Sequence, residues 1–278
     1  MNLRSGARLT STADGAWRGD FGRALHAEWT KLRTAGDMGS LLLLAVVLTV
    51  AVGCGTAKAV KCPDAGCGQD AVKLALTGVT VGQAVIAVLA AAAVSGEYST
   101  GMIRTTLTAV PSRLTVLTAK ATVLTTVVLA SGTAAVLASL LAGRHILPGN
   151  GFTEAHGYPP LSLTDGPTLR AAVGSVLYLA LIALLGLGVA TAVRETATAI
   201  GIVLGLLYLF PVVTQVVNDP QWQHHLQKIS PMTAGLAVQA TVHLHELPVG
   251  PWAGLGVLTA WAAAALLASS LLLHRRDA

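Results

Sequence analysis

Six long stretches of this chain contain no Asp, Glu, Lys or Arg residue. Each one reaches the roughly 20 residues that a helix needs to cross about 30 Å of hydrocarbon. Because lipid offers the backbone no hydrogen bonds, a segment that crosses it must satisfy its own amide and carbonyl groups, as a helix does. We therefore expect an all-α membrane protein with six transmembrane helices, at about 38–57, 74–96, 121–143, 171–193, 196–218 and 247–273.

The composition agrees with a membrane protein rather than a soluble one. Hydrophobic residues make up 53% of the chain and charged residues 11%, against about 25% charged residues in ordinary globular proteins. Helices of a large soluble protein would carry a polar face at helical spacing, and none of the six stretches has one. Residues 38–273 are therefore expected to form one transmembrane domain.

The distribution of basic residues predicts the orientation, since cytoplasmic loops collect Lys and Arg. With the N-terminus inside, twelve of the 18 Lys and Arg residues fall in inner segments and six in outer ones. We expect both termini, including the tail 274–278, to be cytoplasmic in a multi-pass protein of the plasma membrane. Topology and attraction to membrane lipids then explain the net charge of +5, and no nucleic-acid partner is expected.

Two different segments precede the first stretch. Residues 1–17, rich in Ser, Gly, Ala and Arg, are expected to form a disordered cytoplasmic tail. Residues 18–37 have helical periodicity, with Phe21, Leu25 and Trp29 on one apolar arc. This pattern predicts an amphipathic helix in the inner membrane interface, with Trp29 at the depth of the headgroups.

Glu28 falls near the middle of that apolar arc, where contact with lipid alone would not favour an acid. A buried carboxylate needs a partner. We therefore expect Glu28 to face protein and to pair with a basic residue such as Arg104, Arg113 or Lys120. The alternative is a side chain that extends past the apolar surface into water.

The last third of the chain predicts a hairpin and a short buried helix. Arg194 and Glu195 are the only charges between the fourth and fifth stretches, so these two should form a tight hairpin that turns inside. Pro211 should kink the fifth stretch. Residues 229–244 are mostly apolar but only 16 long, which suits a re-entrant or interfacial helix before the last span, protected by protein.

Cys62 and Cys67 lie five residues apart in a loop that we expect outside, beside Pro63 and Gly66. Disulfides persist in such compartments, and the spacing favours a small closed ring. Two free thiols or half of a metal site are the alternatives, although no His lies nearby in that loop.

The sequence offers no recognisable catalytic set. It has no Gly-Lys dipeptide and therefore no P-loop lysine for ATP. The six stretches lack the acids and bases of a proton relay. The spacing of the histidines does not suit one metal on a helix, and no Ser, Cys and His group into a nucleophilic set. We expect no enzyme activity, metal or cofactor in this chain.

Two polar motifs carry a resemblance to a known family. The first contains Gly96-Glu97-Tyr98, Gly101, Arg104-Thr105-Thr106-Leu107, Pro111, Arg113 and Ala119-Lys120. The second is Glu28-Trp29-Thr30-Lys31-Leu32-Arg33, just before the first stretch. Together with the order of the spans, they resemble the ABC-2-type permeases, the membrane subunits of ABC transporters, and in particular an actinobacterial branch. The resemblance covers almost the whole chain from Phe21.

The resemblance implies a bacterial exporter of a hydrophobic or amphiphilic compound. It implies that the loop 97–120 forms a short coupling helix that docks on a separate ATP-binding subunit. The residues of this contact would be Glu97, Tyr98, Arg104, Pro111, Arg113 and Lys120, with Glu28, Trp29 and Lys31 in a contact of the N-terminal helix. Two ATP-binding subunits, which hold ATP and Mg²⁺, would work with a second permease copy or a related permease.

Other functions compete with this one. The basic loop could serve only to anchor the chain to lipid headgroups. An ATPase-independent membrane protein, such as a secondary carrier, predicts that changes in the loop leave transport intact. An intramembrane enzyme would need a polar cluster at one depth of the membrane, and the sequence does not show one.

Overall fold

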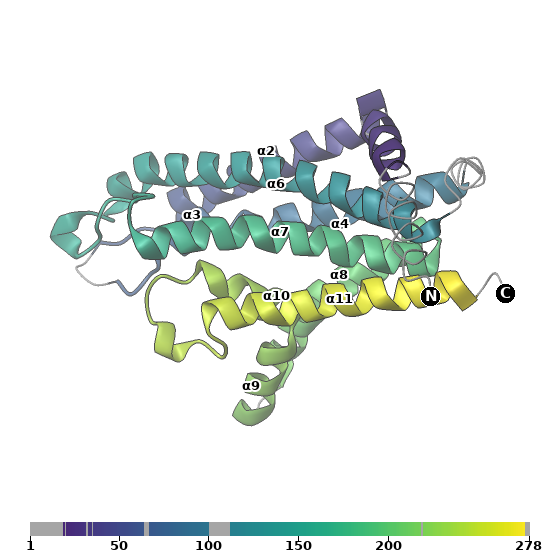
Figure 1. Cartoon of the computed structure of the whole chain (residues 1–278). Coiled ribbons are helices and arrows are strands. Elements are labelled where there is room, and N and C mark those ends of the chain that lie inside the picture. The colour runs from purple at the N-terminus through teal and green to yellow at the C-terminus, as the bar shows by residue number, and fades with distance from the viewer. Residues whose placement is uncertain are drawn as a thin grey trace, which may run out of the picture.

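The fold is an elongated bundle of helices (Figure 1). The computed structural model describes residues 19, 21–31, 33–34, 36–63, 67–99, 112–217 and 219–275, and within them all regular structure is helical. The long helices are α2 (Gly36–Ala59), α4 (Val79–Ser99), α6 (Arg113–Ile146), α7 (Gly166–Val193), α8 (Thr196–Val216) and α11 (Pro251–Arg275). The shorter ones are α3 (Ala71–Ala75), α9 (Pro220–Ile229), α10 (Pro231–Leu236) and the 3₁₀ turns Leu147–Asn150, Glu154–His156, Ala237–Gln239 and Leu244–Glu246.

Five of the described helices are long and apolar enough to cross a membrane: α2, α6, α7, α8 and α11. The chain is therefore a multi-pass membrane protein by length and composition of its helices. The second stretch expected from the sequence corresponds to α4, whose apolar part Val79–Val94 is shorter than the other five. The count of six crossings therefore remains a prediction.

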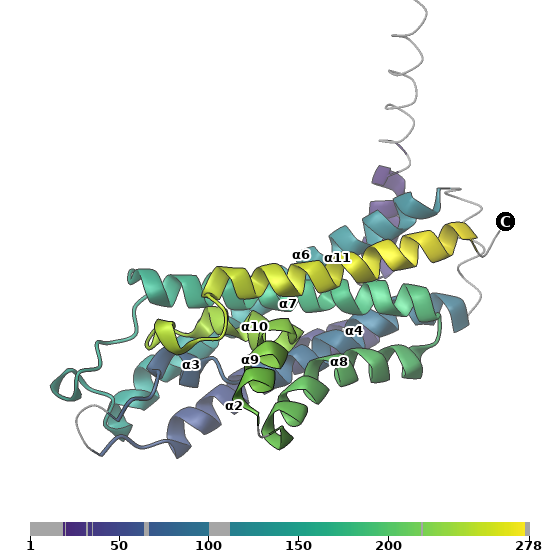
Figure 2. The same cartoon turned by 90° about the horizontal axis from the view of Figure 1, so that it is seen from below.

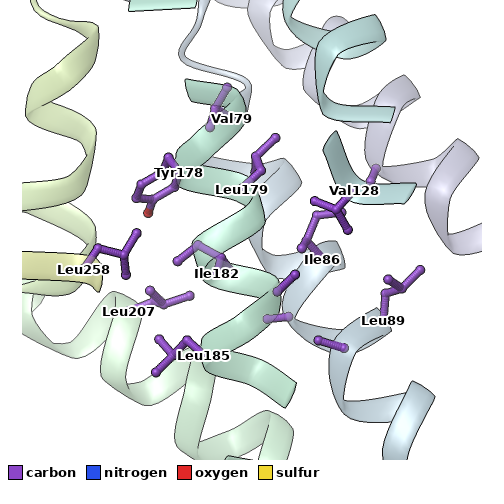
Figure 3. Close-up of a cluster of buried hydrophobic side chains, with 14 of the residues drawn as sticks. Val79, Ile86, Leu89, Val128, Tyr178, Leu179, Ile182, Leu185, Leu207 and Leu258 are labelled. Carbon is purple, nitrogen blue, oxygen red and sulfur yellow. The ribbon is translucent and has the colours of Figure 1, made fainter. Parts of the chain in front are cut away.

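Helix α7 lies at the centre of the bundle and packs against α11, α4, α6 and α8. Its side chains Tyr178, Ile182 and Leu185 are fully buried. Figure 3 shows Tyr178 and Ile182 on the side of Leu258 of α11, while Leu89 of α4 lies on the other side. This core makes α7 the most buried of the five candidate spans, with 61% of its apolar window inside the bundle.

The second and third stretches begin at residues other than those expected. The stretch 74–96 is divided, because α3 ends at Ala75 and α4 begins only at Val79. At the junction Gly78 approaches α2 so closely that a Cβ there would lie 1.8 Å from the Thr49 carbonyl oxygen. Helix α6 begins at Arg113, eight residues before the expected start at 121. The connection between α4 and α6 is therefore shorter than the predicted loop 97–120.

Of the segment 229–244, which the sequence predicts to be a helix protected by protein, residues 230–240 lie mostly buried in the bundle, and the helix is shorter than expected. After α9 ends at Ile229, helix continues only through α10 and the 3₁₀ turn Ala237–Gln239. The backbone is extended from Ala240. Ser230, Ala234 and Val238 have no exposed surface. Helix α10 contacts α7, α8 and α11. Protein therefore surrounds backbone groups that would have no hydrogen-bond partner in lipid.

The long helices alternate in direction, which gives the bundle two distinct ends (Figures 1 and 2). The loop end holds the end of α4, the start of α6, the α7–α8 turn and the end of α11. The disulfide end holds the end of α2, the α6–α7 connection and the start of α11. The basic N-terminal segment 21–34 leads into α2 at the loop end.

Candidate functional site

The N-terminal helical segment 21–31 packs against the start of α6 through small side chains. Ala24 is buried against Val116 and Ala119, and Phe21 covers the edge of this cluster. Glu28 lies one helical turn after Ala24 on the same face, since residues four apart share a face. The packing therefore places the Glu28 side chain against the bundle at the loop end.

Glu28 meets two lysines there. Lys120 Nζ lies 2.6 Å from Glu28 Oε2, and Lys31 Nζ lies 2.9 Å from Oε1. Lys120 is one of the three basic residues that the sequence suggested as partners. Only 5% of Glu28 and 8% of Lys120 is exposed, whereas the Lys31 side chain is 28% exposed. Glu28 thus faces protein and does not extend into water.

The Lys120 ammonium also donates a hydrogen bond to the carbonyl oxygen of Ala93, at 3.0 Å. Ala93 lies in α4, Lys120 in α6 and Glu28 in the N-terminal segment. One charged group therefore joins three elements at the loop end. We call the contact of Glu28, Lys31, Lys120 and the Ala93 carbonyl the Glu28–Lys120 node. Helices α4 and α6, which it links, flank residues 100–111.

Trp29 lies on the other side of the N-terminal segment. Its side chain is 43% exposed, and the Arg33 guanidinium lies 5.6 Å from its ring centroid. An exposed indole beside a cation suits the boundary between lipid and water, where aromatic rings of membrane proteins gather. The segment therefore has two faces: Ala24 and Glu28 face protein, and Trp29 faces away from it.

For the other residues of the predicted docking loop, the structure gives the backbone position or nothing. The backbone of Glu97 and Tyr98 belongs to the last turn of α4, and Arg113 is the first residue of α6. Arg104 and Pro111 lie outside the described residues. The structure therefore shows the two helices that frame the predicted loop, while the docking contact itself stays a prediction.

A second turn at the loop end joins α7 to α8, as the sequence predicts. Arg194 ends α7 in the left-handed conformation, with a φ of 64°. Glu195 caps α8, because its carboxylate accepts hydrogen bonds from the backbone amides of Ala197 and Thr198 at 2.9 and 2.6 Å. The hydrogen bonds from Thr198, and then that from Ala197, lower the pKa of Glu195 from its ordinary value. The acid is thereby kept ionised at the helix N-terminus, where negative charge is favourable.

A polar cluster within the bundle was missed by the sequence reasoning. The Tyr178 hydroxyl donates to Gln83 Oε1, and the Tyr208 hydroxyl donates to the Thr80 carbonyl oxygen. Gln83 is fully buried, and its Nε2 has no hydrogen-bond partner among the described residues. The cluster joins α4, α7 and α8. Its signal was present: a Gln within an apolar stretch is costly in a membrane and usually has a role.

Asp70 was missed as well. Its carboxylate caps α3 by accepting from the amides of Val72 and Lys73, each at 3.1 Å. It also accepts from the amide and hydroxyl of Thr241. The Asp70 carboxylate thus links the segment after α10 to the start of α3 through hydrogen bonds. No pattern in the sequence marks this pairing, since the two partners lie 171 residues apart.

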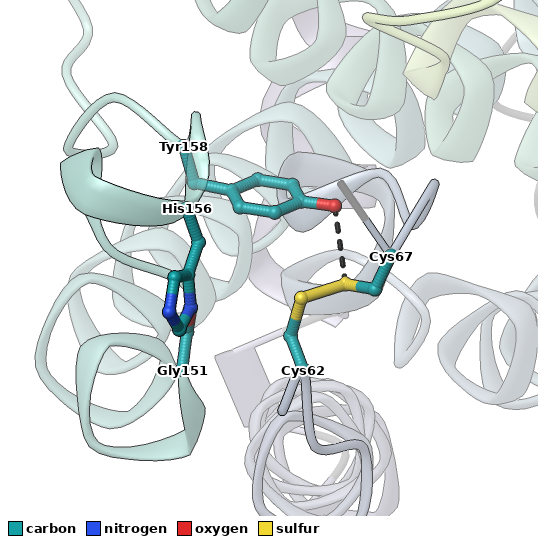
Figure 4. Close-up of a disulfide and its surroundings, with 5 residues drawn as sticks. All are labelled: Cys62, Cys67, Gly151, His156 and Tyr158. Atoms are coloured by element: carbon teal, nitrogen blue, oxygen red, sulfur yellow. Dashed lines mark hydrogen bonds between the residues drawn. A yellow bond between two sulfur atoms is a disulfide. The ribbon is translucent and has the colours of Figure 1, made fainter. Parts of the chain in front are cut away.

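Cys62 and Cys67 form a disulfide, the arrangement that their spacing favoured (Figure 4). The Tyr158 hydroxyl lies 3.2 Å from Cys67 Sγ, and the Cys62 amide donates to the Asn150 carbonyl oxygen at 2.8 Å. The short ring is therefore fastened to the α6–α7 connection. Disulfides of this kind occur in compartments that are oxidising.

Among the described residues no three His, Cys, Asp or Glu side chains gather closely enough to hold a metal ion. Comparison of the chain with protein-family models and with curated proteins gives no match. The polar contacts that join separate elements are thus the Glu28–Lys120 node at the loop end, the Gln83 cluster within the bundle, and the Asp70 and disulfide contacts at the other end.

Proposed function

We propose that this chain is the permease subunit of an ABC transporter of the ABC-2 type, and that it exports a hydrophobic or amphiphilic compound. A separate ATP-binding subunit, present in two copies with ATP and Mg²⁺, would dock on the loop between α4 and α6. A second copy of the chain, or a related permease, would complete the translocation path.

The Glu28–Lys120 node is the observation that best supports this proposal. A loop that receives force from a partner needs a stiff connection to the helices that must move. Here both flanking helices and the N-terminal segment meet at one buried ammonium group. A push on the α4–α6 loop would therefore move three elements together, as in the rigid-body transitions of other switching proteins.

The arrangement of the ends fits the proposed orientation. The segments at the loop end contain Arg33, Arg113, Arg194 and Arg275, which suits the cytoplasmic side. The disulfide lies at the other end, which suits an oxidising exterior. In this proposal α4 is a sixth crossing and both termini are cytoplasmic.

The surfaces of the helices support the proposed class of cargo. The outward face of α8 is apolar, with Ile202, Leu209 and Val212 each 45% exposed or more. If α4 and α8 of two copies line the path, the cargo meets mainly aliphatic side chains there. A hydrophobic or amphiphilic compound is the class of molecule that such a lining accepts.

A charge-reversal experiment tests the proposal. The chain is purified from membranes of cells that also express an ATP-binding subunit encoded beside it, and ATP-dependent efflux of an amphiphilic dye is measured in vesicles. We expect Arg104→Glu with Arg113→Glu to lose both the partner and the ATP-dependent efflux. Lys58→Glu with Lys61→Glu, which adds the same charge at the disulfide end, is the matched control and should retain both.

Two outcomes would overturn the proposal. One is a loop variant that keeps its partner and its ATP-dependent efflux. The other is efflux that persists after ATP depletion and follows an imposed ion gradient, which is the behaviour of a secondary carrier.

A further inference from the structure

A shallow groove of about 250 Å³ lies on the flank of the bundle near the disulfide end. Leucines from α6 and from the segment before α7 line most of it. Leu137, Leu141 and Leu163 are 38%, 57% and 42% exposed. In a membrane the α6 part of this surface faces hydrocarbon, because Leu137 and Leu141 lie on the outside of a helix that is long and apolar enough to cross the bilayer.

Arg144 lies at one end of the groove, on the same face of α6 as Leu137 and Leu141. The spacing of seven residues places it about 10 Å from Leu137 along the helix axis. Its guanidinium makes no hydrogen bond or ion pair with any other described residue. A cation in that position, above a leucine surface and near the end of a membrane helix, matches the depth of lipid headgroups.

Hydroxyl groups complete the polar end. Ser162 and Thr164 line the groove, and their side-chain oxygens hydrogen-bond to each other at 2.7 Å. The neighbouring acid, Asp165, is occupied in capping α7, where its Oδ2 accepts from the amide and hydroxyl of Thr168. Because one hydroxyl donates to the other, the polar end offers one guanidinium and one remaining hydroxyl hydrogen to an incoming anion.

We propose that this groove binds one anionic glycerophospholipid from the surrounding bilayer. An acyl chain lies along the leucines, and the phosphate accepts two hydrogen bonds from the Arg144 guanidinium, whose planar fork matches a phosphate. The groove requires only that the chain cross a membrane, and it is independent of any ATP-binding partner.

The test measures lipid retention on the full-length chain. The protein is delipidated in detergent, incubated with phosphatidylglycerol or phosphatidylcholine, and analysed by native mass spectrometry. We expect wild type to retain one phosphatidylglycerol, and Arg144→Gln to lower that retention at least tenfold. Arg144→Lys should lower it less, because an ammonium keeps the charge but loses the two-fold hydrogen bonding.

A second variant and a matched control keep the test decisive. Leu141→Asn should weaken retention as well, since it places an amide against the acyl chain. Lys58→Gln removes an exposed cation at the same end of the bundle, outside the groove, and should leave retention unchanged. Because Arg144, Leu141 and Lys58 are exposed, each variant should fold, which a thermal unfolding scan verifies.

Three results would overturn the proposal. Arg144→Gln could retain phosphatidylglycerol as well as wild type does. Phosphatidylcholine could be retained equally, with no effect of Arg144→Gln, which would indicate ordinary boundary lipid. Inorganic phosphate could displace the lipid from Arg144 at low concentration, which would indicate a site for a free anion.

Discussion

Lys120 shows how much one residue can determine in a membrane protein with few charges. Its ammonium holds the Glu28 carboxylate and the Ala93 carbonyl oxygen at the same time. Burying two ions costs several kcal/mol of hydration, so the pair persists only with close geometry and further hydrogen bonds. The node has both, because Lys31 supplies a second cation to the same carboxylate.

Removal of the Lys120 ammonium should destabilise the chain. Lys120→Met leaves the buried Glu28 carboxylate with only the partly exposed Lys31, and we expect the free energy of unfolding to fall by about 3 kcal/mol. Adding Glu28→Gln should recover much of this loss, because no buried charge then remains. A denaturant titration in detergent micelles measures both values. Lys58→Met, at an exposed site, should change the unfolding free energy by less than about 0.5 kcal/mol; equal losses in Lys120→Met and Lys58→Met would contradict the role of the node.

At the scale of elements, the buried position of α10 depends on close approach between its backbone and that of α11. A Cβ at Gly254 of α11 would lie 1.9 Å from the carbonyl oxygen of Ala234 in α10. Two residues along the same helix, a Cβ at Gly256 would meet nothing within 4 Å. The two glycines therefore offer the same substitution in two environments.

Gly254→Ala should push α10 away from α11. We expect a loss of about 1–3 kcal/mol in the free energy of unfolding, as for other overpacked contacts, and faster amide exchange in residues 231–239. Gly256→Ala should be neutral or stabilising by up to about 1 kcal/mol, because it removes a glycine from a helix. Similar effects of the two substitutions would show that α10 is not held by this contact.

The start of α8 should depend on pH through Glu195. Its folded-state pKa lies below the ordinary value of 4.5, because the ionised form is hydrogen-bonded at the helix N-terminus. Its contribution to stability is therefore present above 4.5 and is lost as the pH falls through the lowered pKa. The thermal midpoint of wild type should exceed that of Glu195→Gln at neutral pH. We expect this gap to narrow below 4.5, and a gap that stays constant would refute the cap.

The sequence predicted elements better than it predicted contacts between them. Charge-free stretches located α2, α7, α8 and α11 closely, since the cost of a charge in hydrocarbon acts on every residue of a span. The start of α6 was placed too late because Lys120 was expected to end the polar loop. In fact its charge is satisfied inside the bundle. The Asp70 contact and the Gln83 cluster depend on pairs far apart in the chain, for which spacing gives no information.

At the scale of the whole molecule, the topology depends on whether α4 crosses the membrane. Its neighbours α7 and α2 cover it on two sides, so it need not meet lipid along its full length. Protein contacts can satisfy a helix whose apolar part is shorter than the hydrocarbon thickness. The figures place its first residues toward the disulfide end and its last residues at the loop end (Figures 1 and 2).

Cysteine labelling from outside the cell decides this point. In a background where Cys54 is replaced by Ala, we expect Lys73→Cys to react with a membrane-impermeant maleimide in intact cells. Gly96→Cys should react only after permeabilisation. Both positions are exposed, Lys73 in α3 before α4 and Gly96 in the last turn of α4, so they lie on opposite sides only if α4 is a crossing. Labelling of both from the same side would leave five crossings and place the termini on opposite sides of the membrane. The loop between α4 and α6 would then share a compartment with the disulfide, where no ATP-binding subunit could reach it.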